Sequence, residues 1–227
     1  MNDTFSIAID GPAGAGKSTM AKALAKALGA MYLDTGAMYR AFGLALLRQG
    51  VDVHDHDAVA AKADAVNIDV NYVDGGQRIY LDGEDVTDAI RSPEVSGAAS
   101  AVSAVARVRT RMVALQRQIA AGRDVVMDGR DIGTAVLPNA TLKVFLTASA
   151  EERARRRCAE LKEKGMPQPY ELVLAEMKER DYRDTHREAS PLRPAGDAIT
   201  LDTSRLDQDE SIQALLNLAT GAGIGRG

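Results

Sequence analysis

The 227-residue chain is short of the residue types that build disulfide frameworks and metal sites. Cys158 is its only cysteine, so a disulfide framework and a cysteine-based metal site are both excluded. Histidine is also scarce, and His54, His56 and His186 form no metal-ligand spacing on one helix face. The chemistry of this chain must therefore come from other side chains.

Long apolar runs and a large charge of one sign are missing as well. No apolar stretch approaches the ~20 residues that a helix needs to span a bilayer, and the N-terminus lacks the basic-then-apolar layout of a signal peptide. The formal net charge of −4 gives no global attraction to nucleic acid or anionic membranes. We expect a cytoplasmic protein that binds neither, in which any phosphate site depends on local arginine clusters.

The overall composition is that of an ordinary globular protein. Hydrophobic residues make up 45% of the chain and charged residues 26%, which argues against wholesale disorder. A chain of 227 residues can bury a sizeable core and suits one α/β domain, with room for an insert.

The most informative stretch is GPAGAGKST at 11–19, which fits the phosphate-loop pattern G-x-x-x-x-G-K-[ST]. The fixed positions of the pattern are Gly11, Gly16, Lys17 and Ser18. A short apolar segment at 5–9 predicts a buried strand before the loop, and an Ala- and Leu-rich segment at 18–28 predicts a helix after it. Because strand, loop and helix follow in the required order, nucleotide binding is favoured over a Gly/Ala-rich turn without function.

The residue types in this loop suit the binding of ATP. Glycines let backbone N–H groups point inward at phosphates, and the following helix offers its positive end to the same anion. Lys17 is expected to reach the β- and γ-phosphates, and the Ser18 hydroxyl is expected to ligate Mg²⁺. The residues expected to hold ATP here are Gly11, Pro12, Ala13, Gly14, Ala15, Gly16, Lys17, Ser18 and Thr19.

Strand and helix patterns alternate along most of the chain, which predicts an α/β fold with a parallel sheet flanked by helices. Further strands are expected at 31–33, 125–127, 144–146 and 199–201, and helices at 37–49, 57–66, 100–121, 150–164, 170–186 and 212–218. The alternation breaks at about 67–97. There, two runs of alternating apolar and polar residues flank a turn at Asp74-Gly75-Gly76, and 85–87 adds a third short segment. We interpret 67–97 as a small antiparallel insert in a core formed by 1–66 and 98–227.

Polar residues at the ends of the expected strands indicate where a second substrate binds, because ligands of parallel α/β sheets bind at the carboxyl ends of the strands. These residues are found at 10–11, 34–36, 128–131 and 202–203. Arg40, one turn into the helix after 34–36, suits an anion clamp, although a solvated helix arginine explains it equally well. Arg130 stands between two aspartates directly after a strand, which favours a functional role. Asp34 and Asp128 are candidates to orient the water ligands of Mg²⁺.

Two helices in the second half carry further candidate residues. In the helix at 170–186, one apolar face is marked by Tyr170, Val173 and Met177 and continues as Arg180 and Asp184, with Arg187 following in register. This spacing predicts that the first half packs on the core and the second half lines a polar pocket, although a helix that runs past the core into water is an alternative. The helix at 150–164 carries an arginine run at 153–157. Some of these arginines suit a lid, at about 150–168, that closes over ATP; a charged exposed helix is an equally good explanation for any one of them.

Taken together, five segments that follow one another along nearly the whole chain resemble bacterial cytidylate kinases. The segments are 11–19, 33–40, 82–86, 128–131 and 179–184. The phosphate loop alone would indicate only P-loop proteins, whereas the segment 128–131 together with the insert is much more specific. The resemblance implies a monomeric P-loop nucleoside monophosphate kinase of pyrimidine nucleotide metabolism that phosphorylates CMP and dCMP with ATP. It also implies that 67–97 binds the monophosphate.

The resemblance also implies a role for individual residues. Ser100, Arg109 and Asp131 would read the cytosine, Arg180 and Asp184 would hold the ribose, Arg40, Arg130 and Arg187 would hold the acceptor phosphate, Thr35 would lie near the acceptor, and Arg156 and Arg157 of the lid would contact ATP. Lys17 and the three phosphate-binding arginines would be catalytic. The chemistry of Asp131 agrees with cytosine, because a carboxylate accepts from the N4 amino group and would repel the carbonyl oxygen that uracil has there.

Two other functions stay open at this point. One is a P-loop kinase with a different nucleotide, or a non-nucleotide, as acceptor. The other is a GTP-binding switch, which would need an Asn-Lys-x-Asp segment to read guanine; no asparagine in this chain is followed by lysine. A purely structural protein would have no use for Lys17 and Ser18 in this loop.

Overall fold

The structure is a computed structural model that describes residues 4–73 and 75–225. The chain divides into two compact units. One comprises Met1–Tyr32 and Arg123–Gly227 and is called the phosphate-loop unit; the other, Leu33–Gly122, is called the central unit. Within the described ranges, no helix has both the length and the apolar character needed to cross a membrane.

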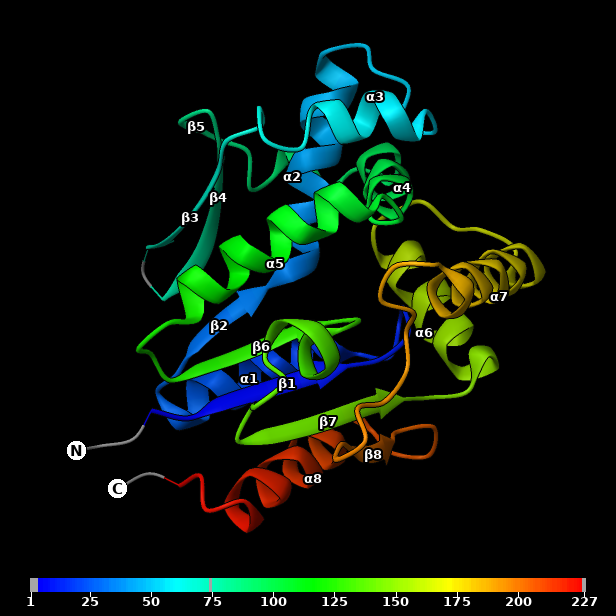
Figure 1. Ribbon diagram of the computed structural model, residues 1–227. Helices are drawn as coiled ribbons and strands as arrows, with labels where there is room; N and C mark the ends of the chain where they lie inside the picture. Colours follow the sequence, from blue (N-terminus) through cyan, green and yellow to red (C-terminus); the bar gives the residue numbers. More distant parts are fainter. Residues whose placement is uncertain (1–3, 74, 226–227) are drawn as a thin grey trace. The chain divides into compact units, whose positions relative to one another are not determined.

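A five-stranded sheet forms the centre of the α/β fold (Figure 1). Its strands are β1 (Ser6–Asp10), β2 (Met31–Asp34), β6 (Val125–Gly129), β7 (Leu142–Thr147) and β8 (Ile199–Asp202), in the order β2-β6-β1-β7-β8. β1 pairs in parallel with both β6 and β7, and β7 pairs in parallel with β8. The predicted α/β class with a parallel sheet is therefore confirmed. β1 is the middle strand and pairs with β6 along one edge and with β7 along the other.

The apolar residues of β1 lie in a core cluster of the phosphate-loop unit. Ile7 and Ile9 pack with Leu24 of α1 (Lys17–Leu28) and with Leu215 of α8 (Gln208–Gly221). Figure 1 shows α8, in red, running along the sheet beside β7. α1 ends at Gly29, whose left-handed backbone lets its N–H bond back to the last turn. The buried strand and the anchored helix hold the loop between them in one place.

Two neighbouring helices, α6 (Ala150–Glu163) and α7 (Tyr170–His186), enclose a second, smaller core cluster (Figure 1). Ala154 and Leu161 of α6 pack against Val173 and Met177 of α7. The apolar half of α7 is thus buried, as its sequence spacing predicted, and the charged half begins one turn after Met177.

The central unit contains the separate small antiparallel sheet that the alternating pattern predicted. Its strands are β3 (Ile68–Val73), β4 (Gly76–Leu81) and β5 (Glu84–Asp85), paired in that order. Its helices are α2 (Thr35–Arg48), α3 (His56–Ala61), α4 (Pro93–Val102) and α5 (Ala106–Ala120), with a 3₁₀ turn η1 at Ala89–Arg91. The expected turn at 74–76 includes Asp74, which lies outside the described residues.

The prediction of one helix over 100–121 is wrong, because the structure has two. α4 ends at Val102 and α5 begins at Ala106. The Ser103 hydroxyl donates to the Ser100 carbonyl, which takes up one acceptor of the last turn, and Val105 is extended. The helix predicted over 57–66 is also shorter, since α3 gives way to tight turns after Ala61.

Candidate nucleotide-binding site

The loop between β1 and α1 has the backbone of a phosphate cradle. Gly11 has φ 150°, and a Cβ there would lie 1.9 Å from the Leu146 carbonyl oxygen, so no side chain fits. Gly14 and Gly16 are left-handed, with φ of 74° and 85°. Gly16 is the N-cap of α1 and has no side chain with which to bond the first-turn N–H groups. The loop and helix end therefore suit the phosphates of ATP.

Lys17 is held inside this loop. Its side chain is 6% exposed, and Nζ donates to the Pro12 carbonyl at 2.7 Å. Burial lowers the pKa of Lys17 well below its ordinary value, and the positive charge of Arg130 lowers it further. A phosphate in the cradle would supply a compensating negative charge and raise the pKa of Lys17 again. The ammonium group is thus stabilised when an anion is bound.

Ser18 shares a carboxylate with Tyr32. Ser18 Oγ donates to Asp128 Oδ2 at 2.9 Å, and the Tyr32 hydroxyl donates to Asp128 Oδ1 at 2.7 Å. Among residues 4–73 and 75–225, no group of three or more His, Cys, Asp or Glu side chains is arranged to hold a metal. A hydroxyl and one carboxylate nevertheless fit Mg²⁺, which takes oxygen ligands and obtains most of them from water and substrate phosphates.

Arg130 and Asp184 form a part-buried ion pair on the same unit. Arg130 Nε donates to Asp184 Oδ2 at 2.9 Å. Burial by itself would raise the pKa of Asp184, but the charge of Arg130 and its hydrogen bond, with further charge from Arg180 and Arg187, hold it below its usual value. The carboxylate at this position therefore stays ionised and holds Arg130.

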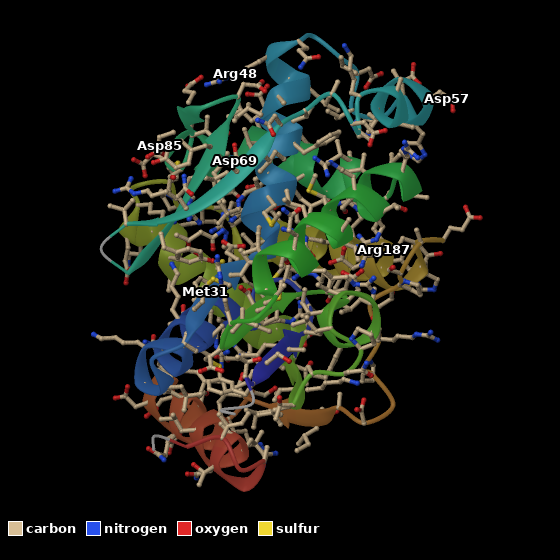
Figure 2. All side chains as sticks on the ribbon, turned by 60° about the vertical axis from the view of Figure 1, so that its left-hand side comes forward. Met31, Arg48, Asp57, Asp69, Asp85 and Arg187 are labelled. Carbon is tan, nitrogen blue, oxygen red and sulfur yellow. The ribbon has the colours of Figure 1, made fainter. Side chains whose placement is uncertain are left out.

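Arg187 lies just past the end of α7 and is labelled in Figure 2. Its Nε donates to the Ser190 carbonyl at 2.6 Å, which fixes the guanidinium at the start of the loop after α7. The charged face predicted from 180, 184 and 187 is thus one cluster in the structure, since the charges of Arg180 and Arg187 both lower the pKa of Asp184.

The segment after β6 is aligned with the phosphate loop. In the sheet, Asp10 of β1 is the register partner of Gly129 of β6, so Gly11 and Arg130 leave adjacent strands at the same edge. Asp131 follows and is buried. The Asp10 carboxylate accepts from the backbone N–H groups of Ile132 and Gly133 at 2.7 Å each. Burial raises the pKa of Asp10 to about 6, although these two bonds oppose the shift.

In the central unit, Asp34 holds Arg40. The Asp34 carboxylate caps α2 by accepting from Ala37 N and also accepts from Arg40 Nη2 at 2.8 Å. Gln77 of β4 fixes the Asp34 backbone by bonding both its N–H and its carbonyl. Arg40 Nε is buried without a hydrogen-bond partner in the described part of the chain, which suits a site for an acceptor anion. Thr35, next to Asp34, is buried.

Ser100 and Arg109 are connected through the break between α4 and α5. The Ser103 hydroxyl donates to the Ser100 carbonyl at 2.8 Å, and Arg109 Nη1 donates to the Ser103 carbonyl at 3.1 Å. The Arg109 guanidinium also lies over the ring of Tyr39, 5.6 Å from its centre. The break between the helices, which the sequence did not predict, therefore connects two of the three residues that were predicted to read a base.

The arginines of α6 differ in what they contact. Arg153 is buried and donates to the Ala13 carbonyl of the phosphate loop at 3.0 Å, and it makes a two-pronged pair with Asp181 of α7. Arg156 donates to the carbonyl of Thr203 at 2.7 Å. Arg157 pairs with Glu160 on its own helix. The ATP-binding role of Arg156 and Arg157 stays a prediction.

The predicted site residues are divided between the two units. Lys17, Ser18, Arg130, Asp131, Arg180, Asp184 and Arg187 belong to the phosphate-loop unit, and Thr35, Arg40, Ser100 and Arg109 belong to the central unit. Sequence reasoning counted Asp10 among the polar residues at the strand ends but gave it no role of its own, and it gave none to Asp181 or Gln77. Only Asp10 carried a signal, because a charged residue ends an otherwise apolar strand directly before the loop.

Comparison with known proteins identifies relatives of this chain over nearly its whole length. The family model described as Cytidylate kinase matches residues 7–221. A cytidylate kinase of Caldicellulosiruptor bescii is 53% identical over 94% of this chain and 95% of its own. One of Mycobacterium avium is 53% identical over 93% of both chains, and one of Enterococcus faecalis is 50% identical over 97% of both.

Solved structures resemble the chain more distantly. A shikimate kinase from Bacteroides thetaiotaomicron matches 95% of this chain and 98% of its own with a TM-score of 0.48 and 14% identity.

Proposed function

The chain belongs to the cytidylate kinase family, and on this premise we propose how its residues transfer the γ-phosphoryl group of ATP to CMP and dCMP. The enzyme is a phosphotransferase of pyrimidine metabolism, and its products are CDP or dCDP and ADP. A phosphate oxygen of the acceptor attacks the γ-phosphorus in line while the bond to the bridging oxygen of ADP breaks. Such a transfer needs positioning and charge neutralisation and no protein nucleophile.

One observation carries this proposal, namely the register of β1 and β6. The pairing of Asp10 with Gly129 brings the phosphate loop and the pair Arg130-Asp131 to the same edge of the sheet. The loop proposed to bind the donor phosphates thus follows β1, and the residues proposed to bind the acceptor follow the neighbouring strand β6. This arrangement supports direct transfer between two bound nucleotides.

We assign the donor phosphates to the loop of the phosphate-loop unit. The backbone N–H groups of 11–19 and the Lys17 ammonium neutralise the β- and γ-phosphates, with Arg156 and Arg157 of α6 as further ATP contacts. Ser18 would hold Mg²⁺ and Asp128 would orient its water ligands, and the bound ion would supply further charge neutralisation of the phosphates. Removal of Mg²⁺ with EDTA is therefore expected to abolish turnover.

The acceptor is assigned to arginines and to one carboxylate. Arg40, Arg130 and Arg187 bind its phosphate, Arg180 and Asp184 its ribose, and Ser100, Arg109 and Asp131 its cytosine, with Thr35 beside it. A positioned arginine of this kind is worth ~10³–10⁵ in rate in related phosphoryl transfers. The segment 67–97 is proposed to form the monophosphate-binding insert of a core made of 1–66 and 98–227, with 150–168 as the lid.

The test is ADP formation from Mg·ATP with CMP, dCMP, UMP, AMP or no acceptor, for the wild type and for Asp131→Asn. The wild type is expected to turn over CMP and dCMP strongly and the others weakly. Asp131→Asn should narrow the CMP-to-UMP preference by about 10-fold or more, because one base-reading contact is worth roughly 1–3 kcal/mol. Asp209→Asn, at the exposed start of α8, is the matched control and should keep the wild-type ratio.

Two outcomes would contradict the proposal in different ways. An unchanged CMP-to-UMP ratio in Asp131→Asn would show that Asp131 does not read the base, whereas the kinase activity itself would stand. Turnover that does not depend on the acceptor would replace the kinase with an ATPase. We also propose that the enzyme is a cytoplasmic monomer; elution at twice the 24.1 kDa mass on size exclusion would contradict the second part.

A further inference from the structure

We propose that Asp10 is a positioning residue for the acceptor nucleotide. Its carboxylate holds the backbone turn directly after Arg130 and Asp131, and thereby sets where the acceptor-binding side chains point. The inference rests on the proposed function, since it concerns the residues assigned there to CMP.

The contact joins two segments that are far apart in the sequence. Asp10 Oδ1 accepts from Ile132 N, and Oδ2 accepts from Gly133 N, each at 2.7 Å. Asp10 itself is 4% exposed, and Ile132 is completely buried. Both carboxylate oxygens are therefore committed to the backbone, in surroundings from which water is excluded.

The geometry of the turn explains why a carboxylate is required. The turn η2 at Ile132–Val136 is a single π turn, in which the Asp131 carbonyl accepts from Ala135 N and Val136 N. The N–H groups of Ile132 and Gly133 precede this pattern and need acceptors outside the turn. An ionised carboxylate offers an acceptor to each of them, whereas an amide offers one acceptor and one N–H group that faces another N–H.

The opposite side of the same turn is also closely packed. A Cβ added at Gly133 would lie 3.2 Å from Lys143 Cδ and 3.4 Å from Asp10 Oδ2. Lys143 is anchored in turn, because its Nζ bonds the Pro138 carbonyl and both oxygens of Asp197. The turn is thus fixed between Asp10 and the stem of Lys143, and its first residues have little room to shift.

Fixing this backbone has a consequence on each side of Asp10. On the C-terminal side, the anchored N–H groups belong to the two residues that follow Asp131. They therefore fix the backbone that carries the side chain proposed to read cytosine. Asp10 also directly precedes the phosphate loop, so the same contact fixes the start of that loop. Loss of the carboxylate should therefore weaken CMP binding and base discrimination more than it lowers the maximal rate.

The experiment measures kcat, KM and the CMP-to-UMP ratio for Asp10→Asn, with the Kd of CMP by calorimetry as a readout that does not need turnover. We expect KM and Kd for CMP to rise about 10-fold and the CMP-to-UMP ratio to fall, since a small misplacement of a binding group is costly. Asp124→Asn is the matched control: its carboxylate accepts from Phe5 N at 2.8 Å and joins the same two segments at the other end of β1. It should keep the wild-type values.

A second variant covers the case in which Asp10→Asn fails to fold, as judged by circular dichroism. Gly133→Ala retains the carboxylate but intrudes on both neighbours, and it should move KM and the ratio in the same direction by a smaller factor. An unchanged Kd and ratio in a folded variant would overturn the inference. A wild type without any preference for CMP would instead overturn the proposed function, so the two failures are distinguishable.

Discussion

Two arginines, one in each unit, make the same paired contact with a carboxylate in different surroundings. In the phosphate-loop unit, Arg153 donates to both oxygens of Asp181, at 3.0 and 2.6 Å. In the central unit, Arg48 of α2, labelled in Figure 2, donates to both oxygens of Glu84 at 2.7 and 2.9 Å. The Arg153 side chain is 5% exposed and the Arg48 side chain 42%. The hydrogen-bond geometry is alike, and only the environment differs.

The difference shows that geometry alone does not decide what an ion pair contributes. Arg153 also donates to the Ala148 carbonyl and to the Ala13 carbonyl of the phosphate loop, so several buried acceptors depend on it. Its loss would leave those acceptors without a donor in the protein interior. Water can replace either partner of the Arg48 pair at little cost.

The largest effect is expected for Arg153→Ala. Removing a buried partner leaves an uncompensated carboxylate, so the free energy of unfolding should fall by about 3 kcal/mol, the lower end for buried pairs because Asp181 is partly exposed. Urea denaturation measures this. Arg155→Ala on the same helix, whose side chain is exposed, is the control and should change little. Equal destabilisation by the two variants would show that burial does not set the difference.

The next effect concerns Asp10, a buried carboxylate that accepts its two hydrogen bonds from the backbone N–H groups of Ile132 and Gly133. Its pKa is raised from 3.8 to about 6, so the folded protein binds this proton more tightly than the unfolded chain. The stability that it contributes is present below about pH 4 and declines as the pH rises to 6, by roughly 2–3 kcal/mol.

The difference in unfolding free energy between the wild type and Asp10→Asn, measured from pH 4 to 7, isolates this proton, because asparagine does not titrate. The wild type should lose stability relative to the variant as the pH rises. Parallel curves would mean that the carboxylate titrates normally and that its burial costs little.

A smaller effect is expected for Asp197→Asn, which sharpens the comparison with an intermediate case. Asp197 is exposed, but the Lys143 side chain that it holds is buried. The variant leaves the ammonium with the Pro138 carbonyl as a partner, and the melting temperature should fall by about 3 °C. If the melting temperature fell as much as it does in Arg153→Ala, the destabilisation would be set by the burial of the cation and not by the number of buried partners that it loses.

The smallest effect is expected for Arg48→Ala. The melting temperature should change by no more than about 2 °C, because both side chains are exposed. In 1 M NaCl this change should disappear, since salt screens exposed charges, whereas the effect of Arg153→Ala should persist. Thermal unfolding at both salt concentrations makes the measurement, and a persistent effect of Arg48→Ala would contradict the distinction.

Much of the fold could be predicted because its signals are local. The phosphate loop lies between a short apolar strand and a helix that ends at Gly29, and each boundary has its own residue signal. The apolar stripe of α7 likewise predicted the burial of Val173 and Met177. Propensity, spacing and capping agree in these segments, so the sequence alone was sufficient.

The break between α4 and α5 could not be predicted from spacing. Apolar residues continue at helical intervals across 103–105, and no glycine or proline marks the interruption. The true start of α4 did carry a signal, since Ser92 caps it and Pro93 occupies its first turn. The contacts of Asp10 with Ile132 and Gly133 depend on strand register, which only the three-dimensional pairing provides.

The order of the strands also has a consequence for how the protein emerges from the ribosome. β1 lies between β6 and β7, so neither of its partners exists until more than a hundred further residues have been translated. At about 5–20 residues per second, that interval is on the order of ten seconds. The central unit is one uninterrupted segment that can complete its own contacts first. We therefore expect the nascent chain to acquire its structured middle before its beginning, with the nucleotide loop among the last parts to mature.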